Sequence, residues 1–151
     1  MTADDLPVPR IVLDTNVCLD LFVFREPQSA ALQVAMHDGT IEAVTRADCR
    51  EEWLRVLRYP QLPVTDASRP AIEAAFDALV RCLPDELATA SVGAPLPRCA
   101  DPDDQKFLEL ALLGGARWLL SKDKAVLRLA RRTAREGWFQ IVTPATWQPP
   151  V

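Results

Sequence analysis

The sequence predicts a single α/β domain, an α/β/α sandwich with a central, mostly parallel sheet. Short apolar runs of strand length alternate with stretches of helical spacing, which is typical of a parallel sheet with helices on both faces. The chain has 151 residues, 49% of them hydrophobic, which suits one domain with its own core. We expect the domain at residues 10–147, between a tail at 1–9 and a tail at 148–151.

The first strand is expected at Arg10 to Asp14, where a short apolar run stops at an acid, as buried parallel strands often do. Three further strands are expected along the chain, at 41–45, 117–120 and 139–142.

Helices are expected between these strands, with prolines and glycines marking their ends. In chain order they are expected at 17–24, 27–37, 47–57, 70–83, 102–113 and 124–136. Gly39 and Gly137 follow two of these helices, and Pro84 stops the one that begins at Pro70. Residues 91–100, with two prolines and a glycine, are expected to form a loop.

Composition excludes several classes of protein. No apolar stretch approaches the roughly 20 residues of a membrane span. The net charge of −4 excludes a globally basic nucleic-acid coat protein, although not a local basic patch. No glycine arrangement cradles a phosphate, and a single histidine, His37 at a predicted helix end, rules out a multi-histidine zinc site. If the protein is an enzyme, its carboxylates must do the chemistry.

The cysteines and the first residues indicate the compartment. The four cysteines are widely spaced, without a C-x-x-C pair, and the acidic, proline-bearing segment 1–9 lacks the features of a secretory signal. We therefore expect reduced, mostly buried thiols in a cytoplasmic protein.

Two acids are expected at the carboxyl edge of the sheet, where open parallel sheets bind their ligands. Asp14 ends the first strand, and Asp123 follows the strand at 117–120 by a few residues. A helix cap is an equally good explanation for Asp123.

Glu52 borders the apolar face of the helix expected at 47–57, three residues after Cys49 and four before Val56, whereas Glu51 faces away. A carboxylate at such a border costs desolvation energy unless something compensates its charge. The alternative is a boundary glutamate that reaches water.

The acidic run at 101–104 opens the next helix. Helix-start chemistry explains Asp101 and Asp103, but apolar residues follow Asp104 at +3, +4 and +7, so its side chain is expected on the core side. Four acids, Asp14, Glu52, Asp104 and Asp123, are thus expected to converge on one cavity. Clustered carboxylates repel one another and need a counter-charge. Without histidine, Mg²⁺ or Mn²⁺ is favoured over zinc, and such ions promote phosphodiester hydrolysis.

Four segments resemble, in the right order and with the right spacing, the motifs of the PIN domain, a nuclease family. They are 11–17 (IVLDTNV), 51–57 (EEWLRVL), 101–108 (DPDDQKFL) and 118–123 (WLLSKD). The closing residues 141–144 (IVTP) are similar to the branch of the family that contains toxin components of toxin–antitoxin systems. The resemblance covers about residues 10–147.

The resemblance implies roles for residues at matching positions. The family's catalytic, metal-binding acids fall on Asp14, Glu52, Asp104 and Asp123. Accessory polar positions near the metal fall on Asn16 and Ser121, and Asp101 is a further helper. Asp20 departs from the family, which often has a small residue such as serine there. It is expected to face solvent, with a second metal ion as the alternative.

The function that the resemblance implies is Mg²⁺-dependent hydrolysis of single-stranded RNA, with Mn²⁺ as the alternative ion. It also implies the toxin of a toxin–antitoxin pair, with an antitoxin protein as partner and a homodimer left open.

A basic stripe follows Asp123. It consists of Lys124, Arg128, Arg131, Arg132 and Arg135, expected on one side of a helix, with Leu127, Ala130 and Ala134 on an apolar side. These cations would bind RNA phosphates beside the acids. A solvated helix face is the alternative.

Two other functions remain open at this point. One is an inactive PIN-like module that binds RNA or a protein without cleaving it. The other is a phosphatase, because Asp14-Thr15-Asn16 loosely resembles the haloacid dehalogenases, but those enzymes have an aspartate where this chain has Asn16.

Overall fold

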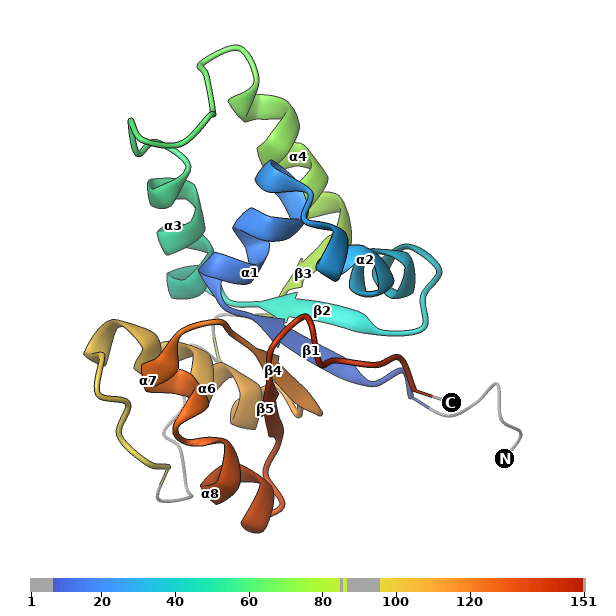
Figure 1. The fold of residues 1–151 in the computed structure, drawn as a ribbon, viewed down its shortest axis with the longest axis vertical. Helices are drawn as coiled ribbons and strands as arrows, with labels where there is room; N and C mark the ends of the chain where they lie inside the picture. The colour runs from blue at the N-terminus through green and yellow to red at the C-terminus, as the bar shows by residue number, and fades with distance from the viewer. Residues whose placement is uncertain (1–6, 85, 87–95, 151) are drawn as a thin grey trace.

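The computed structural model describes residues 7–84, 86 and 96–150. In this part of the chain, five parallel strands form one sheet in the order β3-β2-β1-β4-β5 (Figure 1). The strands are β1 (Arg10–Leu13), β2 (Glu42–Thr45), β3 (Val80–Cys82), β4 (Trp118–Leu120) and β5 (Gln140–Val142). The predicted α/β class with a parallel sheet is confirmed.

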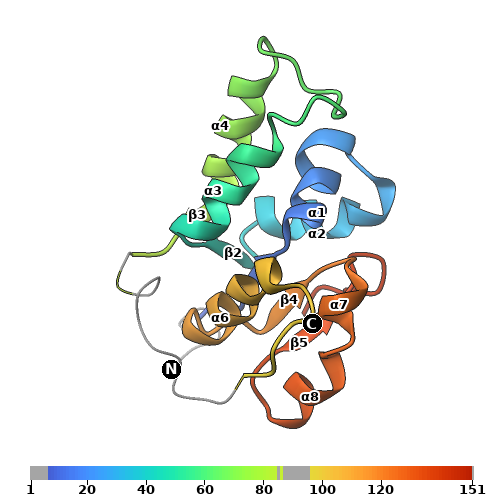
Figure 2. The same ribbon diagram turned by 90° about the vertical axis from the view of Figure 1, so that its left-hand side faces the viewer.

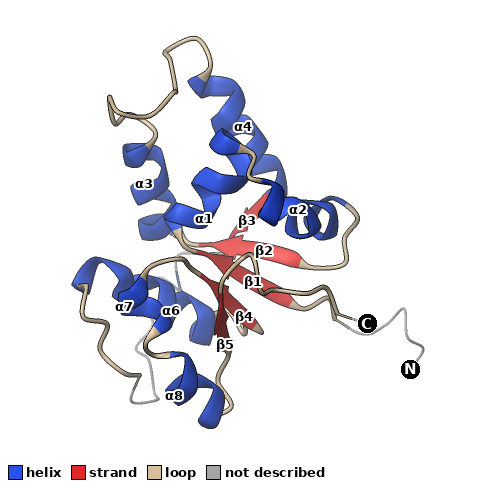
Figure 3. Cartoon of the chain, in the orientation of Figure 1, coloured by secondary structure: helices blue, strands red, loops and turns tan. Residues whose placement is uncertain are grey.

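Helices cover both faces of this sheet (Figure 3). On one face lie α1 (Thr15–Leu19), the π-helix η2 (Asp20–Phe24), α2 (Ala30–His37), α3 (Ala47–Val56) and α4 (Arg69–Leu79). On the other face lie α6 (Gln105–Leu113), α7 (Lys124–Leu127) and α8 (Ala130–Arg135). Two 3₁₀ turns, η3 (Pro27–Ser29) and η4 (Pro102–Asp104), precede α2 and α6. Figure 2 shows the same two layers from the side.

Alternation along the strands divides the core between the two layers, because successive side chains of a strand point to opposite faces. Ile11 and Leu13 pack with the first layer, where Trp53 and Phe76 stack with ring centroids 5.1 Å apart. Val12 packs with the second layer. The central strand β1 is therefore buried from both sides, and it fixes the edge where Asp14 emerges.

Strand β3 was not predicted. The sequence predicts one helix from Pro70 to Leu83, but the helix ends at Leu79, and Val80–Cys82 pair with β2. A three-residue strand that continues an apolar helix has no period of its own. It becomes a strand because it pairs with the edge of β2, and β2 lies far from it in the sequence.

The predicted helix at 124–136 is also wrong in part, because it is divided into α7 and α8. At the division, the Leu129 amide donates to the Val126 carbonyl, a tighter bond than the α-helical one. The buried side chains are Val126 and Thr133, whereas Ala134, predicted on the apolar side, is exposed. The five basic residues therefore lie on two short helices and the turn between them.

Smaller predictions can be checked directly. His37 is exposed at the end of α2, as expected. All four cysteines are free, and all are buried except Cys82. Among the residues described, no helix is both long and apolar enough to cross a membrane.

Some predicted segments lie partly outside the described residues, namely 1–6 and 151 of the two tails and 91–95 of the loop. Residues 96–100 form no helix or strand, as the loop prediction requires. The domain limits at 10 and 147 stay predictions.

Candidate metal centre

The predicted acids meet where the strand order reverses. From β1 the chain crosses to β2 on one side, while β4 lies on the other. The Asp14 amide donates to the Leu120 carbonyl at 2.9 Å, which joins the ends of β1 and β4. Parallel sheets bind ligands in the crevice at such a switch point.

Asp14 lies at this switch point and is only 3% exposed. Its Oδ1 accepts from the Thr15 amide at 2.7 Å, and its Oδ2 accepts from the Ser121 hydroxyl at 2.7 Å. Burial raises the pKa of Asp14 to about 6, although the bonds from Ser121 and Thr15 favour the charged form. The Asp14 carboxylate is thus oriented by the protein and poorly solvated.

The two predicted accessory residues both contact Asp14 and connect it to the segment after β4. The Asn16 amide nitrogen donates to Asp14 Oδ2 at 3.3 Å, and its Oδ1 accepts from the Lys122 amide at 3.1 Å. Ser121, which is completely buried, accepts from the Asp123 amide at 3.0 Å. These contacts fix Asp123 relative to Asp14. Their role in a reaction stays a prediction.

Three carboxylates form a group that we call the acid cluster: Asp101, Asp104 and Asp123. One carboxylate oxygen from each lies within 4.8 Å of the others, close enough for one ion to contact all three. Asp104 is 8% exposed, and its buried Oδ2 has no hydrogen-bond partner among the described residues. Burial, the charge of Asp14 and the adjacent Asp123 raise the pKa of Asp104 to about 8.

Helix capping explains part of this cluster, but not all of it. Asp101 accepts from the Asp103 amide at 3.0 Å, and Asp123 accepts from the Ala125 amide at 2.9 Å, so both are N-caps. Asp104 has no such bond to its own helix. Asp123 is therefore both an N-cap and a member of the acid cluster.

Glu52 lies at the same edge but belongs to a different arrangement. Its Oε1 accepts from Lys106 Nζ at 2.9 Å, and its Oε2 accepts from the Thr15 hydroxyl. The two charged side chains are only 14% and 17% exposed. The structure thus groups Asp104 and Asp123 with Asp101 and places Glu52 against a lysine.

The expectation that Asp20 faces solvent is wrong. Asp20 is 3% exposed, and its carboxylate forms an ion pair with Lys122 Nζ at 2.7 Å. The two residues are 102 positions apart, so nothing near Asp20 in the sequence signals the pair.

Sequence reasoning also missed the roles of Thr15 and Lys106. The only local signal for either was proximity, because Thr15 follows Asp14 directly and Lys106 comes two residues after Asp104.

The donor set of the acid cluster fits a hard divalent cation. All its donors are carboxylate oxygens, the ligands that Mg²⁺ and Mn²⁺ prefer. The unpartnered, buried Asp104 Oδ2 is the observation that fits best, because a buried polar atom without a partner is costly.

The predicted RNA-binding residues follow the acid cluster in the sequence. Lys124, Arg128, Arg131, Arg132 and Arg135 are all exposed and form no ion pair within the described residues. They begin directly after Asp123. We call them the basic face.

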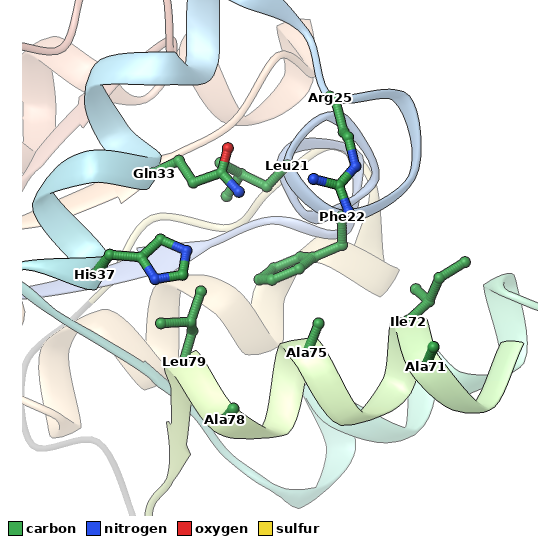
Figure 4. Close-up of a pocket in the computed structure, with 10 residues that line it drawn as sticks. All are labelled: Leu21, Phe22, Arg25, Gln33, His37, Ala71, Ile72, Ala75, Ala78 and Leu79. Atoms are coloured by element: carbon green, nitrogen blue, oxygen red, sulfur yellow. The ribbon is translucent and has the colours of Figure 1, made fainter. Parts of the chain in front are cut away.

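A separate groove of about 430 Å³ lies between η2, α2 and α4 (Figure 4). Phe22, Ile72 and Leu79 line it with several alanines, and Arg25, Gln33 and His37 supply its polar atoms. None of the described residues that line this groove carries a carboxylate, so it does not share the chemistry of the acid cluster.

Comparison with known proteins agrees with this geometry. A chain in the crystal structure of VapBC2 from Rickettsia felis, bound to a DNA fragment from their promoter, has a TM-score of 0.54 and 10% sequence identity; the match covers 89% of this chain and 98% of that one. At this identity the likeness shows the fold alone. No curated protein matches the chain. The family model described as the PIN domain matches residues 10–125, more than half of the sequence, and the chain therefore belongs to the PIN domain family.

Proposed function

We propose that the protein is a metal-dependent endoribonuclease that hydrolyses phosphodiester bonds of single-stranded RNA. One observation carries this proposal: the buried Asp104 carboxylate, with one oxygen unpartnered among the described residues, lies beside Asp101 and Asp123 at the switch point of a PIN-domain sheet. An uncompensated acidic group at this place suits a divalent cation.

Asp104 and Asp123 would hold the ion, with Asp101 as helper and Asp14 as the adjacent ligand. Asn16 and Ser121 keep the Asp14 carboxylate in one orientation through the bonds described above. Mg²⁺ is the proposed ion, with Mn²⁺ as the alternative. When bound, such an ion lowers the pKa of an attacking water and stabilises the leaving oxygen. Glu52, the fourth predicted acid, differs from these residues because one of its oxygens bonds the Lys106 ammonium.

Single-stranded RNA is the proposed substrate, because the basic face begins one residue after Asp123 and its cations are exposed. Cations of this kind bind phosphates along a single strand without reading its sequence. The strand would then run from the basic face across the acid cluster.

We further propose that the protein acts in the cytoplasm as the toxin of a toxin–antitoxin pair. An antitoxin protein would cover the acidic crevice. The sequence resemblance to the toxin branch of the family supports this proposal, and the structural likeness to a VapBC2 chain agrees with it.

Two experiments test these proposals separately. Purified protein should cleave single-stranded RNA with Mg²⁺ and not with EDTA, and Asp104→Asn should lose this cleavage. Absence of Mg²⁺-dependent cleavage would favour the inactive binding module. Expression of the wild type in bacteria should arrest growth, and expression of Asp104→Asn should not. Equal growth with both proteins would count against the toxin proposal but not against the nuclease.

A further inference from the structure

We propose that the ammonium group of Lys106 takes the place of a second divalent cation beside Glu52, so that the centre binds a single ion. This inference rests on the proposed metal-dependent function and specifies how many ions that function uses.

Both carboxylate oxygens of Glu52 already accept a hydrogen bond, and one of them accepts it from a cation. Its Oε1 bonds Lys106 Nζ, and its Oε2 accepts the hydroxyl hydrogen of Thr15. The Glu52 side chain is only 14% exposed, so the Lys106 ammonium, rather than a cation from solution, is its counter-ion. An ion at Glu52 would first have to displace Lys106.

Lys106 is held beside Glu52 by further contacts. Its Nζ also donates to the Asp103 carbonyl, and it lies 5.3 Å from the centre of the Phe107 ring. The lysine is on α6, two residues after Asp104, so its charge has a fixed position relative to the acid cluster. A charge fixed by three contacts is difficult for a dissolved cation to displace, because the ammonium is already desolvated.

The acid cluster lacks any comparable cation. Among the described residues, no lysine or arginine forms an ion pair with Asp101, Asp104 or Asp123. Glu52 therefore has a counter-charge built into the chain, whereas the counter-charge of the three acids in the cluster must come from solution. Lys106 is therefore a positioning residue, because it acts by holding the Glu52 carboxylate rather than by contacting the ion or the substrate.

Counting bound Mn²⁺ on RNA-free protein tests the inference. Titration calorimetry and electron paramagnetic resonance should give one ion for the wild type and two for Lys106→Met, because that change frees Glu52. The double variant Glu52→Gln, Lys106→Met should return to one ion. Lys124→Met is the matched control: it removes the same charge from an exposed lysine beside Asp123 and should leave the count at one.

Several outcomes would overturn the inference. Two ions on the wild type would do so, and so would a folded Lys106→Met protein that still binds one. If Lys106→Met fails to fold, Lys106→Arg preserves the cation: it should bind one ion, and a count of two would contradict the proposal. A wild type that binds no Mn²⁺ at all would overturn the proposed function itself, which is a distinguishable result.

Discussion

Two groups of carboxylates lie at the same edge of the sheet, and their charges are compensated in different ways. Glu52 and Asp20 each bond a lysine, with Lys106 and Lys122 at 2.9 and 2.7 Å. The acid cluster has no lysine or arginine partner within the described part of the chain. A desolvated carboxylate takes up either a cation or a proton. The comparison shows which acids the chain neutralises itself and which it leaves to an ion or a proton.

Asp14 and Asp104, two acids without a lysine or arginine partner among the described residues, have raised pKa values. Burial raises the pKa of Asp14 to about 6, and burial with neighbouring carboxylates raises that of Asp104 to about 8. Without an ion, Asp104 therefore keeps a proton at neutral pH that a divalent cation would displace.

The strongest test removes the uncompensated group. Asp104→Asn and Asp14→Asn should each lower the cleavage rate at a fixed, sub-saturating Mg²⁺ concentration by more than about 100-fold, since a lost ligand weakens metal binding at least as much as a lost supporting contact. The metal-free fold should be preserved or slightly stabilised, because each change removes a desolvated acid. Rates from a fluorescent RNA and unfolding curves in EDTA measure both effects.

Asp103→Asn is the matched control for this test, because it is the adjacent, exposed acid on η4 and lies outside the acid cluster. It should cleave RNA like the wild type. An equal loss in Asp103→Asn would mean that general acidity, rather than the cluster, matters.

A second test compares the two groups through pH. Since the folded-state pKa values of Asp14 and Asp104 are raised above the usual value near 4, the folded protein binds more protons than the unfolded one between about pH 4 and pH 8. The metal-free protein should therefore lose stability as the pH rises through this window, by more than about 10 °C in Tm. Thermal unfolding in EDTA measures this loss.

Millimolar Mg²⁺ should reduce that loss, and Asp104→Asn should show a smaller pH dependence than the wild type. A wild type and variant with the same pH dependence would show that other groups cause it.

A third test removes the lysine from one of the two paired acids. Lys122→Met leaves the buried Asp20 carboxylate without its cation and should destabilise the protein by about 2 kcal/mol. Asp20→Ser should cost less, because Lys122 is 40% exposed and its ammonium can turn to water. Urea unfolding of both variants measures the difference.

The double variant Asp20→Ser, Lys122→Met should recover most of the stability lost in Lys122→Met. If it instead shows the sum of the two single losses, the pair does not act as one unit.

The smallest expected effect concerns cations that no carboxylate holds. Replacing Arg128, Arg131 and Arg135 with Gln should weaken RNA binding and flatten its salt dependence, by roughly 0.7 in the log–log slope for each lost phosphate contact. Filter-binding titrations at several salt concentrations, in the Asp104→Asn background, measure the slope without cleavage.

The same change at Arg25, Arg55 and Arg58, three exposed arginines outside the basic face, provides the control and should leave the slope unchanged. Identical slopes for both triple variants would mean that the basic face is a solvated surface.

A feature can be predicted from the sequence when the residues that determine it lie close together along the chain, and is missed when they lie far apart. Strands β1, β2, β4 and β5 follow from apolar runs with local stop signals, and Asp14 follows from where β1 ends. Strand β3 was missed because its conformation depends on β2, and the division between α7 and α8 because it depends on which side chains are buried.

The same distinction between local and distant contacts applies to the candidate site. Asp104 was found from the pattern of its own helix start, and Asp123 from its place after the strand expected at 117–120. The pairing of Glu52 with Lys106 and that of Asp20 with Lys122 join residues 54 and 102 positions apart, and a single sequence contains no signal for such contacts.

The bond between Asp14 and Ser121 also has a consequence for the order in which the protein is made. Asp14 is synthesised early and is held by Ser121, 107 residues later. Translation adds roughly 5–20 residues per second, so Asp14 waits several seconds for the residue that orients it. Strand β4 cannot pair with β1 until residues 118–120 have left the ribosome. The nascent chain therefore lacks an assembled centre during most of its synthesis, while it is in direct contact with ribosomal RNA.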